Sequence, residues 1–324
     1  MQKEHINKIS KYEPSDFKQF RLNSYEMFKS SFNPIYGPTI KEDFDKYNYE
    51  NTFLNIDKYD DGVIYCDINT ASKKYKNLFD KYFNNIIKYD EHKYTMFNSA
   101  MFCGGMFIYI PKNKKNISLD IKCVNPIERT IIVVDENSSL EINEFIDNNK
   151  NILNNYVVEI YVNKNAKLIY TSNQNLEKNI YNLNIKRASI LENGRIDYYL
   201  NSYGSYITYE YPCIRLEGDN SCANVILNVK SEGIQEIDLG SKIIHMGKNT
   251  KSNIDSNFTV SKKGYAAYRG LVEIKKEASN SICNINSNIF INDNYSRCDI
   301  IPKHFVNNNT SIINQNSNIK KLEV

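Results

Sequence analysis

The chain has 324 residues with 41 basic and 38 acidic side chains, so a net charge of +3 gives no field of the kind that marks nucleic-acid binders. Asn (48) and Tyr (25) are abundant and Trp is absent, a bias typical of AT-rich coding sequences. Interleaved Ile, Val, Tyr and Phe supply enough apolar surface for a packed core. No apolar run has the length of a membrane span, and the first residues lack a secretory signal or a transit peptide.

The first hundred residues carry helical patterns. The Pro14-Ser15-Asp16 segment can cap a helix, which the turn residues of 33–38 then end. Its apolar stripe consists of Phe17, Phe20, Met27 and Phe28. A second helical pattern covers residues 70–88, where large apolar side chains recur at offsets of three and four. We expect both stripes to pack in a core.

From Met106 onward the pattern changes to short β-strands separated by turns. The expected strands cover residues 106–110, 117–123, 130–134, 157–162, 167–172, 196–201, 207–211, 223–229, 242–245, 266–274 and 281–291. Turn residues such as Asn137, Gly194, Asn220 and Asn249 separate them. A sandwich, a barrel and a parallel β-helix all suit this pattern, and buried Asn ladders with aliphatic stacks slightly favour the β-helix.

The motifs of several enzyme classes are missing. The seven cysteines contain no Cys-x-x-Cys pair, which argues against a zinc ribbon or a ferredoxin-type site and fits a reducing compartment. Gly240-Ser241-Lys242 is not a phosphate loop, so the chain should not hydrolyse ATP by itself. No nucleophile elbow and no paired-histidine zinc motif occurs, and no run of clustered carboxylates indicates a carbohydrate-active enzyme.

Several polar or small residues have a structural interpretation. Gly104 and Gly105 indicate a tight backbone turn, and Cys103 beside them is expected to be buried. We interpret Glu128-Arg129 as a solvated ion pair at a coil corner. His245, among apolar neighbours, is expected to be a hydrogen-bonded core imidazole.

Two groups of residues are candidates for chemistry. Gln174 and the stretch 181–187, which contains Lys186, can place polar side chains inside a coil, where they form either a network lining a passage or an Asn-type ladder. Cys283, Cys298 and His304 lie in the last predicted coils, and thiolate and imidazole are suitable iron ligands. Their spacing alone favours scattered structural cysteines.

Four strings of residues occur in a specific order: 103–112, 128–136, 238–251 and 268–272. In this order, between about Pro14 and Pro302, the chain resembles the SufB/SufD family of iron-sulfur cluster assembly scaffolds, and SufB in particular. The resemblance implies a mainly β fold, a right-handed parallel β-helix with a helical N-terminal region. We expect a helical region at 1–100, a β-helix core at 101–302, and a short polar tail at 303–324 where family members continue into C-terminal helices.

The resemblance implies a scaffold role without enzymatic activity. Such scaffolds work with the SufC ATPase, with SufD or a second SufB copy, and with a sulfur-donor protein, and they build a transient iron-sulfur cluster. A reduced flavin is also associated with the complex. The alternative is a non-catalytic SufD-like subunit that binds SufC without holding a cluster. The coding bias indicates a plastid-encoded protein, as in an apicoplast, and an AT-rich bacterium with a cytoplasmic location is the other possibility.

The family's functional residues match this chain unevenly. Gln174 and Lys186 correspond to polar residues of the family's internal passage and are our candidate catalytic residues, whereas the aromatic expected two residues after the Gln is Leu176. Ile146 stands where the family has its sulfur-accepting cysteine. Cys298, within 294–299, corresponds to the cluster-holding cysteine, and with the nearby His304 it is our candidate metal ligand. The family's His-Glu pair falls on Gln315-Asn316.

Overall fold

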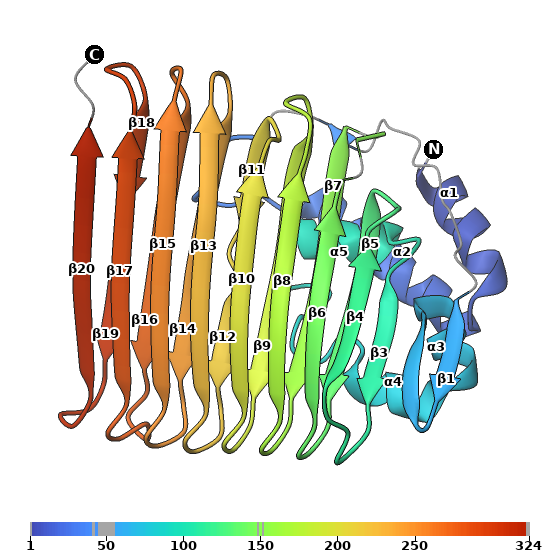
Figure 1. Cartoon of the computed structure of the whole chain (residues 1–324). Coiled ribbons are helices and arrows are strands. Elements are labelled where there is room, and N and C mark those ends of the chain that lie inside the picture. The colour runs from blue at the N-terminus through green and yellow to red at the C-terminus, as the bar shows by residue number, and fades with distance from the viewer. Residues whose placement is uncertain (1, 41–42, 45–55, 148, 151, 322–324) are drawn as a thin grey trace.

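A computed structural model describes residues 2–40, 43–44, 56–147, 149–150 and 152–321. About half of the chain is β-strand (51%), arranged as a parallel β-helix of about eight turns, which confirms the predicted fold class. The strands stand side by side in a long stack, and the helices gather at its N-terminal end (Figure 1). Strand β20 lies at the opposite end of the stack from α1.

The N-terminal region is mostly helical. Its helices are α1 (Gln2–Ile9), the 3-10 helix η1 (Ser10–Tyr12), α2 (Ser15–Ser30), α3 (Ile68–Lys74), α4 (Lys76–Tyr82) and α5 (Lys93–Met101). The predicted helix after Pro14 is therefore confirmed as α2. Two strands that the sequence did not reveal, β1 (Asp57–Asp60) and β2 (Val63–Asp67), pair antiparallel with each other, and β2 pairs antiparallel with β3 (Met106–Ile110).

The helix predicted at 70–88 is wrong in extent. Helices α3 and α4 meet at Tyr75, whose φ of −115° and ψ of 33° interrupt the helix, and α4 ends at Tyr82. Beyond that point, the backbone N–H groups of residues 84–87 donate to the Glu159 carboxylate, at 3.0 to 3.2 Å, instead of to helical carbonyls. A buried carboxylate thus overrides the helical periodicity.

Two parallel sheets form the β-helix. The first continues from β3 through β5 (Ile127–Val134), β7 (Leu153–Val162), β9 (Tyr181–Ile190), β11 (Ile207–Glu210), β12 (Cys213–Leu216), β14 (Glu236–His245), β16 (Tyr265–Ile274), β18 (Arg297–Ile300) and β19 (Lys303–Val306). The second contains β4 (Ile117–Lys122), β6 (Ser139–Ile146), β8 (Lys167–Asn175), β10 (Arg195–Tyr203), β13 (Cys222–Glu232), β15 (Lys251–Ser261), β17 (Ile282–Ile291) and β20 (Ile312–Lys321). Every expected strand lies within or overlaps one of these.

Each coil repeats the same turn. Asn137, Asn165, Asn193, Asn220 and Asn249 all have φ between 53° and 59°, the left-handed region that Asn tolerates better than most residues. Neighbouring turn amides also bond to each other, as Asn165 Nδ2 donates to Asn137 Oδ1 at 3.0 Å across 28 residues. The turn therefore sets the coil length and explains part of the Asn content.

The helices cover the outer face of the first sheet. Phe79 and Phe97, from α4 and α5, share a buried cluster with the outward side chains Ile131 and Val157, whereas Ile132 and Val158 face the interior core. Strands β5 and β7 are consequently buried on both faces. Strands β19 and β20 continue the pairing past residue 302, where the sequence indicated only a polar tail. The division into domains stays a prediction.

Candidate functional site

A polar network lies inside the β-helix. In a strand, successive side chains point to opposite faces. Glu144 on β6, Ser172 and Gln174 on β8, Lys186 on β9 and Glu210 on β11 share the inward face with aliphatic neighbours, and all are buried. The two sheets therefore bring together polar side chains that are up to 66 residues apart in sequence.

Lys186 is the centre of this network. Its Nζ lies 2.6 Å from Glu144 Oε2, 3.4 Å from Glu210 Oε1 and 2.8 Å from Ser172 Oγ. Burial alone lowers the pKa of Lys186, but the carboxylates of Glu144 and Glu210 outweigh burial and raise it well above its usual value. The ammonium therefore stays charged within the coil. Two acidic side chains thus face one cation inside the coil.

Gln174 extends the network toward the coil edge. Its Nε2 donates to Glu210 Oε2 at 2.6 Å, and its Oε1 accepts from Asn182 Nδ2 at 2.8 Å. Asn184 Nδ2 donates to the same Glu210 oxygen at 2.9 Å. The two residues predicted from the resemblance, Gln174 and Lys186, are thus joined through Glu210. For Gln174 and residues 181–187 the sequence allowed a polar network or an Asn-type ladder, and the structure contains the buried network.

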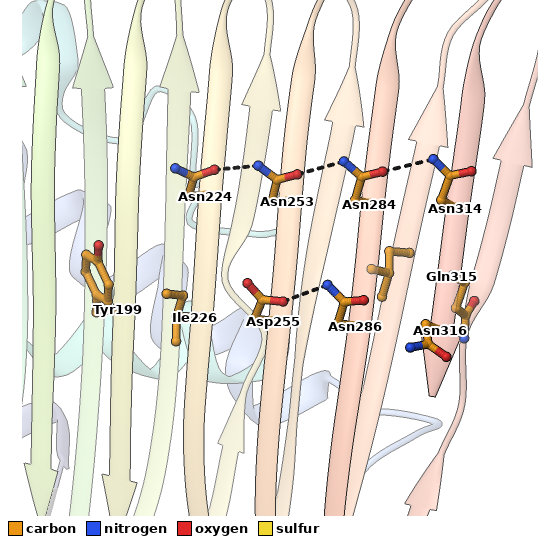
Figure 2. A pocket seen from close by; sticks show the side chains of 11 residues that line it. Tyr199, Asn224, Ile226, Asn253, Asp255, Asn284, Asn286, Asn314, Gln315 and Asn316 are labelled. Atoms are coloured by element: carbon orange, nitrogen blue, oxygen red, sulfur yellow. Dashed lines mark hydrogen bonds between the residues drawn. The ribbon is translucent and has the colours of Figure 1, made fainter. Parts of the chain in front are cut away.

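Asn ladders do occur, but on the outside. Asn224, Asn253, Asn284 and Asn314 form one row of amide–amide hydrogen bonds, each 2.9 Å long, along the outer face of the second sheet (Figure 2). With Tyr199, Ile226 and Asp255 they line a shallow groove of about 630 Å³. The expectation of buried ladders is wrong for this row, because its Asn residues occupy outward strand positions while their strand neighbours face the interior core.

Cys298 and His304 lie on the last described coil of the first sheet. Cys298 is opposite the interior residue Ala266 on β16, packs against the interior core and is half-buried. His304 is opposite Val272, six residues further along β16, and is exposed. Six residues of strand span about 20 Å, so the fold does not bring these two predicted metal ligands together.

Burial makes the cysteine thiols of the described chain harder to deprotonate. Burial, with a smaller effect from Asp299, raises the pKa of Cys298 to about 12. Burial likewise raises the pKa of Cys66 to about 12 and that of Cys283 to about 11. Among the described residues, no three His, Cys, Asp or Glu side chains form a group that could hold a metal ion. The described residues therefore do not supply a complete metal site at Cys298.

Ile146 and Leu176 lie beside another thiol. They share a small buried cluster with Cys123, whose N–H donates to the Phe145 carbonyl at 3.0 Å. Burial first, and then Glu144 and Glu128, raise the pKa of Cys123 far above its usual value. This thiol is therefore an inert, protonated core group.

The prediction of a solvated Glu128-Arg129 pair is wrong. Glu128 faces the interior, where its carboxylate accepts from the N–H of Val124 and Asn125 at 3.1 and 2.8 Å, and burial raises its pKa to about 7. Arg129 points the other way, under the helices, and pairs with Glu159 at 2.8 Å. Because the side chains leave the strand on opposite faces, the two residues do not pair with each other.

The other structural interpretations are confirmed. His245 is fully buried, with Nδ1 2.7 Å from Thr250 Oγ1 and Nε2 2.9 Å from Ser252 Oγ. Cys103 is buried. Gly105 has a φ of +114°, and a Cβ there would lie 2.0 Å from the Arg129 carbonyl oxygen, so only glycine fits this turn.

Sequence reasoning missed Glu144 and Glu210, the two carboxylates that hold the network. A signal for Glu144 existed, since it occupies the same alternating phase as Leu140, Ile142 and Ile146, which all face inward. A charged residue in the apolar phase of a strand indicates a buried partner of opposite charge.

Comparisons with known proteins cover nearly the whole chain. Residues 120–324 match the family model described as SUF system FeS cluster assembly, SufBD core domain, and residues 11–119 match the SufBD protein N-terminal region. An iron-sulfur cluster assembly SufBD family protein of Staphylococcus saprophyticus is 30% identical over 314 residues, which are 92% of this chain and 68% of that protein. A protein of the same description from Staphylococcus aureus USA300 gives the same identity and coverage. In the part of the chain that the structure describes, no helix is both long and apolar enough to cross a membrane.

Proposed function

Because the chain belongs to the SufBD family of iron-sulfur cluster assembly proteins, we propose that it is the SufB-type scaffold component of a SUF complex. The observation that carries this proposal is the position of Cys298, a half-buried thiol on the last described coil that faces the interior of the β-helix. The cluster is the cargo of the scaffold, and the scaffold has no catalytic activity of its own.

In this proposal the Cys298 thiol loses its proton only when it binds iron. Its pKa of about 12 keeps the thiol protonated at neutral pH. Iron binding must displace that proton, so ligation becomes more favourable as the pH rises. The interior network around Gln174 and Lys186, in earlier coils of the same β-helix, supports a role in handling sulfur.

In this proposal the partners follow from the family. The SufC ATPase supplies nucleotide hydrolysis, SufD or a second copy of SufB completes the assembly, and a separate protein donates sulfur. The separation of Cys298 and His304 along the strand supports a cluster whose further ligands come from a second subunit. A reduced flavin would serve as electron source within the complex.

A SufD-like structural role is the second candidate. It is favoured by Ile146, an apolar side chain at the sulfur-accepting position, and by the protonated, buried state of the neighbouring Cys123. In that role the chain binds SufC and carries no cluster. A pull-down that recovers SufC with the chain, while anaerobic reconstitution yields no cluster, would select this role.

Reconstitution tests the scaffold role directly. The purified chain is incubated anaerobically with iron, sulfide, SufC and SufD, and we expect cluster absorbance above a protein-free control. Cys298→Ser should retain less iron than Cys213→Ser, because Cys213 is a buried thiol on β12, away from the last coil. Equal iron content in the two variants would remove Cys298 from the proposal, and absence of any cluster would sink the scaffold role.

The cellular location is a separate proposal. The AT-rich residue bias supports a plastid-encoded protein, and a cytoplasmic protein of an AT-rich bacterium is the alternative. Fractionation of the source cell with an antibody against the chain distinguishes them, since signal confined to the soluble cytoplasm would exclude the plastid.

A further inference from the structure

A small pocket lies on the outer face of the first sheet, beyond the part that the helices cover. It encloses about 220 Å³ between strands β14 and β16, the β18–β19 junction and the segment that follows α2. None of the residues of the interior network lines it. Pockets of this kind, largely apolar with a few convergent polar groups at the seam between two regions, are where small ligands usually bind.

The walls of the pocket are aromatic and aliphatic. Tyr36 and Tyr211 pack edge to face with ring centroids 5.7 Å apart, and Leu271 and Ile301 form the opposite side. Gly37 allows this arrangement, since its φ is +89° and a Cβ there would lie 2.7 Å from the Tyr209 ring. The backbone turn at Gly37 thus places Tyr36 beside Tyr211, and the two rings form the aromatic part of the wall.

The rim of the pocket is positively charged. Lys242, Leu271 and Lys303 are register neighbours on β14, β16 and β19, so two lysines flank one leucine about 10 Å apart. Within the described residues, neither lysine forms a salt bridge, whereas Arg269 is held by Asp238 at 2.9 Å. The two lysine charges at the rim therefore have no counter-ion among the residues that the structure describes.

We propose that this pocket binds a small organic anion with a flat apolar body. The ring lies against Tyr36 and Tyr211, and the anionic group lies between Lys242 and Lys303. Aromatic faces favour stacked or edge-on rings, and desolvation beside the apolar walls strengthens the attraction between lysine and anion. An aromatic carboxylate and a nucleoside monophosphate share this chemistry. The proposal does not depend on cluster assembly.

Fluorescence titration with anilinonaphthalene sulfonate, a planar aromatic anion, tests the site on the full chain. We expect saturable binding of one equivalent. The double variant Lys242→Gln/Lys303→Gln should bind about tenfold more weakly, and Tyr36→Ala should also weaken binding. The matched control is Lys248→Gln/Lys251→Gln, which removes the same charge from exposed positions outside the pocket and should bind like the unmodified chain.

Competition identifies the anionic group. Displacement of the probe by benzoate assigns a carboxylate ligand, and displacement by AMP alone assigns a nucleotide. Circular dichroism verifies that the variants are folded, which is expected because Tyr36 is half exposed and both lysines lie at the surface. Non-saturable binding, equal affinity in the two double variants, or failure of both competitors would overturn the proposal.

Discussion

Glu128 and Arg129 are neighbours in the chain but lie in two different environments, one inside the β-helix and one beneath the helices. The sequence alone led to a solvated pair, because a charged dipeptide at a strand end is usually exposed. The correct signal was the unbroken apolar run of 131–134 on the same strand, which is typical of a strand buried on both faces. The sequence does not show that the N-terminal helices cover the outer face of this strand.

The buried Arg129–Glu159 pair should be essential for stability. Glu159→Gln leaves the Arg129 guanidinium without a counter-charge in a fully buried position, so we expect a loss of about 3–5 kcal/mol in the free energy of unfolding. Glu192→Gln is the matched control, because its pair with Lys164 is half exposed and should contribute little to stability. Urea unfolding measures both, and similar losses would contradict the assignment.

His245 predicts a pH dependence of stability. Burial lowers the pKa of His245 to about 4, against about 6.5 in the unfolded chain. The contribution of the neutral His245 to the free energy of unfolding is complete above pH 6.5. It decreases by about 1.4 kcal/mol per pH unit as the pH falls toward 4. Relative to His245→Gln, the unmodified chain should lose stability between pH 6.5 and 4.5. A constant difference between the two proteins across this range would refute the prediction.

At the scale of elements, the strands were predictable where inward residues are aliphatic. Strand β15 was missed because Ser252 and Ser256 occupy inward positions, where an alternating apolar pattern would need large side chains. These hydroxyls are satisfied inside the coil, as Ser256 Oγ donates to Ser287 Oγ at 2.9 Å. A hydrophobic pattern does not reveal a strand whose interior positions carry polar side chains that bond to polar side chains of the next coil.

The interior network couples β6, β8, β9 and β11, and Lys186 holds it together. Lys186→Met should destabilise the chain by about 3–5 kcal/mol, because Glu144 and Glu210 remain buried without their cation. Adding Glu144→Gln should recover part of the loss, since one of the two carboxylate charges disappears. Chemical denaturation of the single and double variants measures this coupling. Additive losses would show that the residues act independently.

At the scale of the whole molecule, each coil contacts mainly its two neighbours, so stability should vary along the stack. Backbone amides of β20 should exchange with deuterium fastest, because among the described strands it pairs only with β17 and most of its residues are exposed. Amides of β7 should exchange slowest, since the helices cover one face and the interior core the other. Hydrogen exchange followed by mass spectrometry checks this, and uniform protection would contradict it.

The overall architecture could be predicted, whereas the site could be predicted only in part. Pattern alone left a sandwich, a barrel and a β-helix open, and the ordered strings of the SufB/SufD family decided between them. Gln174 and Lys186 were found through the same resemblance. Their carboxylate partners Glu144 and Glu210 were not, since contacts between coils join residues that no local window contains.

A second row of outward-facing amides accompanies the row of Asn224, Asn253, Asn284 and Asn314 on the same sheet. In it Asn228 both donates to Asn201 and accepts from Asn257, whereas Asn318, the last member among the described residues, donates to Asn288. Replacing a middle amide removes two bonds and replacing the last removes one, each contributing about 1 kcal/mol or less. A scan of serine substitutions along this row should therefore give a larger loss of stability at Asn228 than at Asn318.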